Sequence, residues 1–196
     1  ASDSLGHVTF LSSGAVFGDR RGTVEEEDLR LGQAFRSPAA ESLAVAEALL
    51  RRKLSDVPVT VLRTPQVLGP RSGRALPRPT GLHRLLALLA SASTEAVLPL
   101  PPGANRSVQA LPADFVAEAL YAVSVLGTRG HTYHVAEGDP PSLADVLERA
   151  AVFFDKRLEQ SFDARSLGRL LLKSPGFWLS QRTSGALSEW AEGPLL

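Results

Sequence analysis

Apolar runs of two lengths alternate along the first half of the chain, and they predict strands and helices in alternation. Residues 7–12 and residues 58–63 are short β-branched and apolar runs of the kind that form buried strands in parallel sheets. Between them, residues 38–54 form an Ala- and Leu-rich stretch of helical length. Its first residue, Pro38, suits the first turn of a helix, where no amide donor is needed. Strand, helix and strand at this spacing predict a right-handed βαβ unit, and hence an α/β protein with a parallel sheet.

The second half of the chain continues this pattern with shorter elements. Residues 68–80 are rich in Pro, Gly and Arg, which indicates a loop. Ser142 and Asp145 have the spacing of a capping box at the start of a helix. The remaining elements that we expect are short strands at 107–111 and 131–135 and helices at 81–92, 112–126, 142–154, 165–173 and 183–190. The C-terminal third is therefore expected to be rich in helix.

Composition narrows the classes of protein to which the chain can belong. Its 196 residues, 44% of them hydrophobic, suffice for one domain with a sizeable core, or most of one. Lys and Arg together number 21, as do Asp and Glu, and no long basic block occurs, so nucleic acid is not an expected partner. The most apolar helical stretch, residues 83–92, is far shorter than the roughly 20 residues that a membrane span needs.

Two residue types are missing altogether. The lack of Cys excludes disulfides, Cys-based zinc sites and a thiol nucleophile, and a cytoplasmic location is the simplest expectation. The lack of Met leads us to expect that the chain is processed, truncated or the remainder of a longer protein.

Five separate segments resemble the extended short-chain dehydrogenase/reductases (SDRs), in the order and spacing of that family. Residues 11–18 (Leu-Ser-Ser-Gly-Ala-Val-Phe-Gly) resemble the segment Ser-Ser-x-x-Val-[Tyr/Phe]-Gly that follows the fifth SDR strand. Residues 18–38 resemble the acyl-reductase branch, which includes male-sterility and thioester-reductase proteins. The other three segments are residues 61–70, which resemble the next strand and the loop over the nicotinamide, and residues 113–119 and 131–136, which resemble a substrate-domain helix and the strand after it.

The resemblance covers roughly residues 7–150 and implies the C-terminal half of a Rossmann-type, doubly wound parallel sheet with a small helix-rich subdomain. It implies that residues 1–70 are the second half of the Rossmann-like domain. Residues 71–196 would then be the substrate-side cap, which also contributes late strands to the sheet. The Gly-rich dinucleotide fingerprint of the family's first half does not occur in this sequence. We therefore expect either the missing N-terminal half or another protein chain to cover the exposed edge of the sheet.

The active-site helix of the family reads Tyr-x-x-Ser-Lys-x-x-x-Glu, and the chain matches it only in part. Ser42 and Glu47 stand in the expected places, but Ala39 replaces the Tyr and Leu43 replaces the Lys. SDR chemistry needs a phenol whose pKa is lowered by a nearby ammonium group, and neither Ala39 nor Leu43 can supply one. Ser13 matches the hydroxyl that polarises the substrate carbonyl, so one catalytic position is retained.

Two interpretations of the altered helix agree with each other. In the first, Ala39 and Leu43 mark a pseudoenzyme. In the second, they are packing residues, since they fall near one helix face with Ala46 and Leu50. We do not expect another residue nearby to replace the missing Tyr or Lys. The only tyrosines are Tyr121 and Tyr133, both later in the chain, and the nearest lysine is Lys53.

By the same resemblance, NADP or NAD would lie against residues 12 and 63–67. The positions that we carry over as cofactor-binding are Ser12, Arg63, Thr64, Pro65 and Val67. Arg63 has an equally good structural explanation, because a charged residue that ends a buried strand must either form an ion pair or reach a cleft.

Other candidates for chemistry are weaker. His7, His83, His131 and His134 lack the spacing of a metal site. Residues 25–28 (Glu-Glu-Glu-Asp) read as a solvated acidic rim, and Asp114 as a first-turn residue favoured by the helix dipole. Trp178 and Trp190 are either core residues or a docking patch.

Two functions of different class follow. The first is a non-catalytic SDR-like module that acts through protein contact, with residual dinucleotide binding. It would form homo- or hetero-oligomers through helix 39–54, whose outward positions would be Glu41, Ala44, Ala48, Arg51 and Arg52. The alternative is an NADPH-dependent reductase of an acyl thioester or related carbonyl compound, with Ser13 and a non-standard proton donor. A third possibility is a structural fragment whose function belongs to a larger protein.

Overall fold

The computed structural model describes residues 6–29, 32–35, 37–53, 57–73, 81–92, 97–101 and 103–159. The expected helices at 165–173 and 183–190, and both Trp residues, lie outside these ranges. The contacts divide the chain into two compact units. Unit 1 comprises Ala1–Ala75 and Gln109–Gly138, and unit 2 comprises Leu76–Val108 and Asp139–Leu196.

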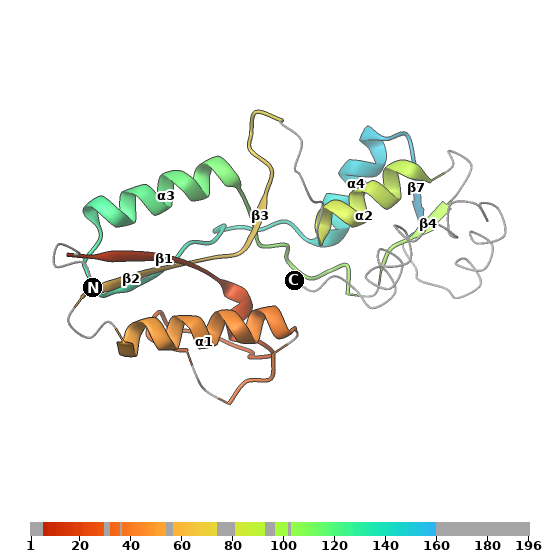
Figure 1. Cartoon of the computed structure of the whole chain (residues 1–196). Helices are drawn as coiled ribbons and strands as arrows, with labels where there is room; N and C mark the ends of the chain where they lie inside the picture. Colours follow the sequence, from red (N-terminus) through yellow and green to blue (C-terminus); the bar gives the residue numbers. More distant parts are fainter. Residues whose placement is uncertain are drawn as a thin grey trace. The chain divides into compact units, whose positions relative to one another are not determined.

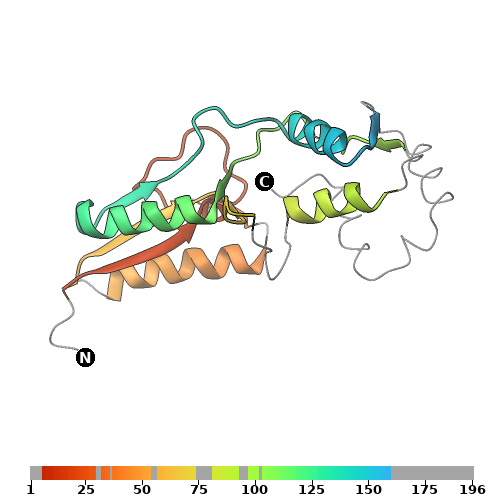
Figure 2. The same ribbon diagram turned by 90° about the horizontal axis from the view of Figure 1, so that it is seen from above.

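Unit 1 is built on a parallel sheet with a helix on each face (Figures 1 and 2). Strands β1 (Val8–Ser13), β2 (Val59–Thr64) and β6 (Thr132–His134) pair in the order β1-β2-β6. Helix α1 (Pro38–Lys53) covers one face and α3 (Ala113–Leu126) covers the other. The predicted strand–helix–strand unit with parallel strands is confirmed.

The two long strands differ in burial because of their places in the sheet. All six residues of β2 are buried, as the central position of β2 requires. In β1 only Ser12 is buried, and Leu11 is 42% exposed. The strand predicted at residues 7–12 is present as β1, but the prediction that this strand is buried is wrong. Among the described residues it has a strand neighbour on one side only, so its side chains are half covered.

Helix α1 buries a polar as well as an apolar face. Ala40, Ala44 and Glu47 lie one turn apart and are buried, whereas Glu41 and Arg52 are exposed. The expectation that Ala44 and Arg51 face outward is thus wrong, because the helix turns its 40–44–47 stripe towards the sheet and Arg51 bonds to Glu47 and to Thr132 of β6. The expected subunit contact through residues 39–54 stays a prediction.

Short elements complete unit 1. A 3-10 turn, η1 (Gly14–Phe17), follows β1, and β3 (Gln66–Leu68) pairs in parallel with β5 (Ala110–Pro112). The strand expected at 107–111 therefore begins later. Asp114 lies in the first turn of α3, as expected. Burial would raise the pKa of Asp114, but hydrogen bonds from Arg71 lower it below its usual value.

Unit 2 packs two amphipathic helices and two short strands around leucine side chains. Its elements are α2 (Leu82–Ser91), β4 (Val97–Pro99), α4 (Leu143–Phe153) and β7 (Arg157–Glu159), and the two strands pair in parallel. The predicted capping box is confirmed: the Ser142 hydroxyl accepts a hydrogen bond from the Asp145 amide at 3.1 Å, and the Asp145 carboxylate accepts one from the Ser142 amide at 3.0 Å. Both units combine helices with parallel strands, which confirms the α/β class.

No helix in the described part of the chain is long and apolar enough to cross a membrane.

Candidate ligand site at the carboxyl ends of the strands

Ligands of open parallel α/β sheets bind outside the carboxyl ends of the strands. In unit 1 these ends are Ser13 of β1, Thr64 of β2 and His134 of β6. The register of the strands brings the three residues to the same end of the sheet. The loop that follows η1 and the start of α1 lie at the same end of the sheet. This end therefore holds the three positions that the sequence marked as catalytic, Ser13, Ala39 and Leu43.

Ser13 keeps a hydroxyl at the end of β1. It caps η1, and its Oγ accepts a hydrogen bond from the Ala15 amide at 3.2 Å. A serine hydroxyl has one proton to donate and a second lone pair. This bond therefore leaves Ser13 able to donate to a ligand oxygen, as the carried-over role requires.

The positions of the family's Tyr and Lys carry no titratable group. Ala39 is exposed in the first turn of α1, and Leu43, one turn later, is half-buried. The two tyrosines of the sequence do not replace the missing phenol. Tyr121 is 71% exposed on α3, and the Tyr133 hydroxyl accepts a hydrogen bond from the Thr128 amide at 2.6 Å, in the loop before β6. That loop lies at the amino end of the strand, away from Ser13.

A buried carboxylate joins α1 to the sheet next to these positions. The side chain of Glu47 has no exposed surface. It accepts hydrogen bonds from Ser12 Oγ at 2.9 Å, from Arg63 Nε at 3.2 Å and Nη2 at 2.6 Å, and from Arg51 Nη2 at 2.7 Å. Arg51 also donates to the Thr132 hydroxyl on β6. The carboxylate thus ties α1 to β1 and β2, and Arg51 ties the same helix to β6.

Arg63 is fully engaged in this ion pair and its surroundings. Besides Glu47, its Nη1 donates to the Glu26 carbonyl at 3.2 Å and to His134 Nε2 at 3.0 Å. Its guanidinium also lies 5.3 Å from the centroid of the Phe17 ring. The guanidinium group thus makes four hydrogen bonds within the protein, to Glu47, Glu26 and His134. This geometry favours the structural explanation of Arg63 over contact with a cofactor.

The expected cofactor residues divide into buried and accessible ones. Ser12 and Thr64 are buried, and Thr64 Oγ1 donates to the Ser12 carbonyl at 3.5 Å. Pro65 is half-buried and Val67 is 39% exposed. The side chains of Pro65 and Val67 can offer a ligand apolar contact only. The Gly-rich turn that cradles the pyrophosphate of a dinucleotide in the SDRs does not occur in this sequence.

Sequence reasoning missed part of the cluster around Arg63. Phe17, Glu26, Arg51 and His134 all contact Arg63 or Glu47, yet none was assigned a site role. Only Arg63 itself gave a usable signal, as a charge in an otherwise apolar strand. In the described part of the chain, no three His, Cys, Asp or Glu side chains group as metal ligands would.

Comparison with known proteins shows the fold of the chain. No protein-family model and no curated protein matches it. Among solved structures, the terminal R domain from the myxalamid PKS-NRPS biosynthetic pathway is 22% identical over 91% of this chain and 44% of that chain, with a TM-score of 0.70. The structure of RMD from Pseudomonas aeruginosa complexed with NADPH is 21% identical over 85% of this chain and 58% of its own, with a TM-score of 0.62.

A third solved structure gives the same result. The dTDP-glucose 4,6-dehydratase from Bacillus anthracis, in complex with NAD, is 21% identical over 80% of this chain and 50% of its own, with a TM-score of 0.57. The chain thus spans about half the length of these structures. The chain therefore shares the Rossmann-like α/β fold of these structures.

Proposed function

We propose that the chain is a non-catalytic SDR-like module that acts through contact with another protein. The observation that carries this proposal is the pair Ala39 and Leu43 on a helix that otherwise keeps its place beside Ser13. A methyl group and an isobutyl group neither donate a proton nor lower the pKa of a phenol. Because the Gly-rich fingerprint does not occur in this sequence, the pyrophosphate contacts of any dinucleotide that the whole protein binds are proposed to come from residues beyond it.

Restoring the missing pair tests the proposal by gain of function. Ala39 is exposed, so Ala39→Tyr adds its ring without displacing core atoms, and Leu43→Lys extends from a half-buried position. We expect the wild type to show no NADPH oxidation with a panel of acyl thioesters and aldehydes, and the double variant to show measurable turnover.

The matched control is Ala39→Phe with Leu43→Lys, which has the ring and the ammonium group without the hydroxyl. It should stay inactive. Turnover by the wild type would contradict the proposal.

A second function has one observation in its favour. Ser13 retains a hydroxyl at the end of β1, and the myxalamid R domain is similar over 91% of the chain. Both observations agree with an NADPH-dependent reductase of an acyl thioester, whose proton donor would come from outside the described residues. This alternative predicts wild-type turnover that Ser13→Ala abolishes and that Ser12→Ala, at a buried neighbour bonded to Glu47, lowers less.

We also propose that a further strand covers the free edge of β1. The Val8 amide donates to the Pro58 carbonyl. In a parallel ladder alternate residues bond to the same neighbour, so the amides of Thr9 and Leu11 point away from β2. Unpaired amides on an apolar strand favour pairing with another segment. Since the chain spans about half of the solved structures that it matches, the N-terminal half of the same fold is the favoured partner.

Hydrogen exchange tests this partner. The amides of Thr9 and Leu11 should be protected in the intact protein and should exchange freely in the monomeric fraction of a preparation of residues 1–196 alone. That preparation should also associate or precipitate. A monodisperse, stable monomer of residues 1–196 would contradict the proposal.

A further inference from the structure

The segment between η1 and α1 carries the acidic run and is closed at its base. We call its described residues, 18–29 and 32–35, the acidic loop. The Asp19 amide donates to the Ala34 carbonyl at 3.0 Å, and the Ala34 amide donates to Asp19 Oδ1 at 2.8 Å. Gly18 has a φ of +61°, and a Cβ there would lie 2.3 Å from the Ala34 carbonyl oxygen. Only glycine fits this closure.

The middle of the acidic loop has a second attachment, to the carboxyl ends of the strands. The Glu26 carbonyl accepts from Arg63 Nη1 at 3.2 Å, and Glu26 Oε1 accepts from the His134 amide at 2.8 Å. Within the loop, Arg20 pairs with Asp28 at 3.2 Å. The expected solvated rim is exposed at Glu25, Glu26 and Glu27, yet it is held at Glu26.

The state of His134 follows from its partner. Its Nε2 lies 3.0 Å from Arg63 Nη1, and a guanidinium group can only donate. Nε2 must therefore carry a lone pair, which makes the imidazole neutral. A proton on Nε2 would set two donors and two positive charges against each other, and it would remove one of the bonds that orient Arg63 towards Glu26.

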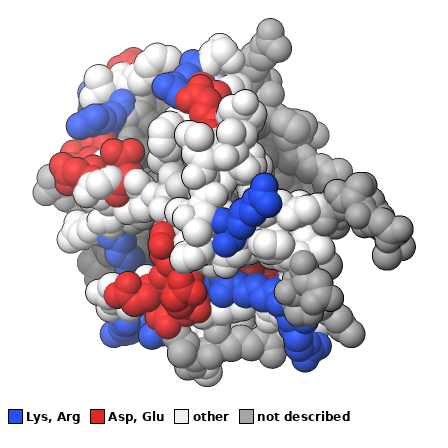
Figure 3. Space-filling view, turned by 90° about the vertical axis from the view of Figure 1, so that its left-hand side faces the viewer, with Lys and Arg blue, Asp and Glu red and all other residues white. Residues whose placement is uncertain are grey.

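We propose that His134 is a proton-sensitive latch for the acidic loop. Neutral His134 holds Arg63 Nη1 in place for Glu26, and protonated His134 releases residues 24–29 from the carboxyl ends of β2 and β6. The latch lies at the end of the sheet where ligands of this architecture enter. Figure 3 views the molecule from the left-hand side of Figure 1, the side at which β1 begins, and shows acidic and basic side chains next to one another on that surface.

Charges of both signs act on His134. Arg63 of β2 favours the neutral ring, and Glu25 and Glu26 of the loop and Glu47 of α1 favour the charged ring. Burial, followed by Arg63, lowers the pKa of His134 below its ordinary value in spite of the three carboxylates. The latched state is therefore complete at neutral pH and is lost as the pH falls below about 6.5 towards the lowered pKa.

Hydrogen exchange against pH tests the latch in the intact polypeptide. Protection factors of amides 24–29, corrected for intrinsic exchange, should fall by up to about tenfold for each pH unit between about 6.5 and the lowered pKa of His134, and should level off below it. His134→Gln keeps an acceptor for Arg63 without a titrating group, so its protection should stay flat from pH 7.5 to 5. The control is His131→Gln, at an exposed histidine just before β6, which should behave as the wild type.

Three results would overturn the proposal. One is wild-type protection that does not change with pH. Another is protection that rises in acid, which would mean that the imidazolium ring pairs with Glu25 or Glu26 and tightens the loop. The third is the same pH dependence in His134→Gln. If that variant does not fold, the midpoint of the wild-type His134 ring titration by NMR must coincide with the midpoint of loop release, and separate midpoints would also refute the latch.

Discussion

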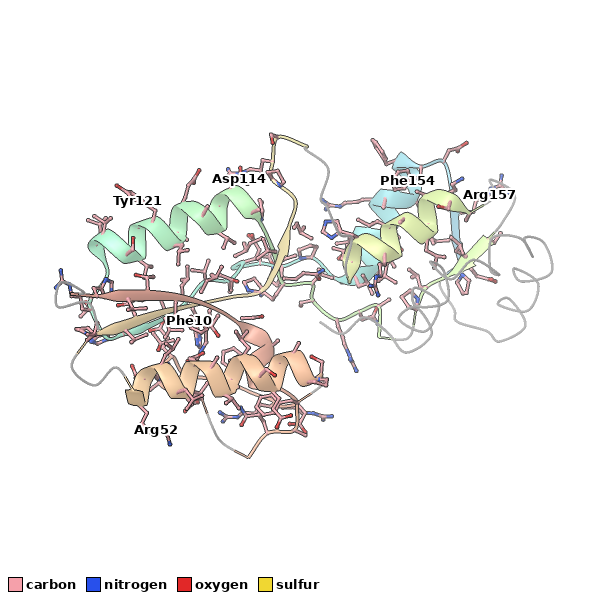
Figure 4. The ribbon with its side chains drawn as sticks, in the orientation of Figure 1. Phe10, Arg52, Asp114, Tyr121, Phe154 and Arg157 are labelled. Atoms are coloured by element: carbon pink, nitrogen blue, oxygen red, sulfur yellow. The ribbon has the colours of Figure 1, made fainter. Side chains whose placement is uncertain are left out.

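Unit 1 and unit 2 are stabilised by different kinds of core. Among the described residues, every buried polar or charged side chain belongs to unit 1: Ser12, Glu47, Thr60, Arg63, Thr64 and Thr132. The described core of unit 2 is apolar throughout and is centred on leucines of α2 and α4, namely Leu82, Leu85, Leu88, Leu89, Leu143 and Leu147. Figure 4 shows the side chains of both regions.

The difference between the two cores affects how precisely each unit fixes the position of its helices. Hydrogen bonds to the Glu47 carboxylate are directional, so they fix the rotation of α1 against β1 and β2 and the level of Arg63 in the sheet. Apolar contacts tolerate repacking as long as volume is kept. We infer that unit 1 uses polar pairing to place α1, the helix that resembles the active-site helix of the SDRs, and that the described residues of unit 2 are under no comparable constraint.

Breaking the buried ion pair should have the largest effect. Glu47→Gln leaves the Arg63 charge buried without its counter-charge, which should lower the free energy of unfolding by about 3–5 kcal/mol. Urea unfolding followed by circular dichroism measures the change. Glu41→Gln, on the exposed side of the same helix, should cost under ~1 kcal/mol. Equal losses in the two variants would mean that the pair contributes no specific stability.

A cavity in the apolar core should have the next largest effect. Leu147 is fully buried in α4, so Leu147→Ala should lower the free energy of unfolding by about 2–5 kcal/mol. Val152 lies on the same helix and is 84% exposed, so Val152→Ala should change it by less than about 0.5 kcal/mol. Salt distinguishes the two cores: the Leu147→Ala loss should be the same at low and high ionic strength. A salt-dependent loss would contradict an apolar core.

The helix cap of α4 should have the smallest effect. Ser142→Ala removes the hydroxyl that accepts from the Asp145 amide, at a cost of about 1 kcal/mol. Hydrogen bonds from Ser142 also lower the pKa of Asp145. A lowered carboxyl pKa contributes stability above the unfolded value, which is lost as the pH falls through the folded value. The cost of Ser142→Ala should therefore shrink between pH 5 and pH 2, and a cost that is constant with pH would refute this linkage.

The elements that the sequence predicted are those with a strong period or a clear boundary. Pro38 marked the start of α1, and Ser142 with Asp145 marked the start of α4. Strands β3, β4 and β7 were missed because each has only three residues and none lies in a longer run such as residues 131–135, from which β6 was predicted. Ala44 was placed outward because an Ala-rich helix has little contrast between its faces, and the direction of α1 was decided by Glu47.

The candidate site was predictable only where a residue type was out of place. Ala39, Leu43 and Ser13 came from motif resemblance, and Arg63 from a charge in an apolar strand. His134 and Glu26 could not be connected to Arg63 from the sequence, since they lie 71 and 37 residues away along the chain. His134 lies beside Arg63 because of the parallel register of β2 and β6, and this register exists only in the folded chain.

The central claim, a retained scaffold without SDR chemistry, is tested most directly by one titration. NADPH and NADH are titrated against the intact polypeptide, with nucleotide fluorescence recording binding and the absorbance of the same samples recording oxidation in the presence of acyl thioesters. The account predicts no oxidation by the wild type, and saturable binding if the residues beyond this sequence supply the pyrophosphate site. Sustained oxidation that disappears in Ser13→Ala would contradict it and would identify a reductase.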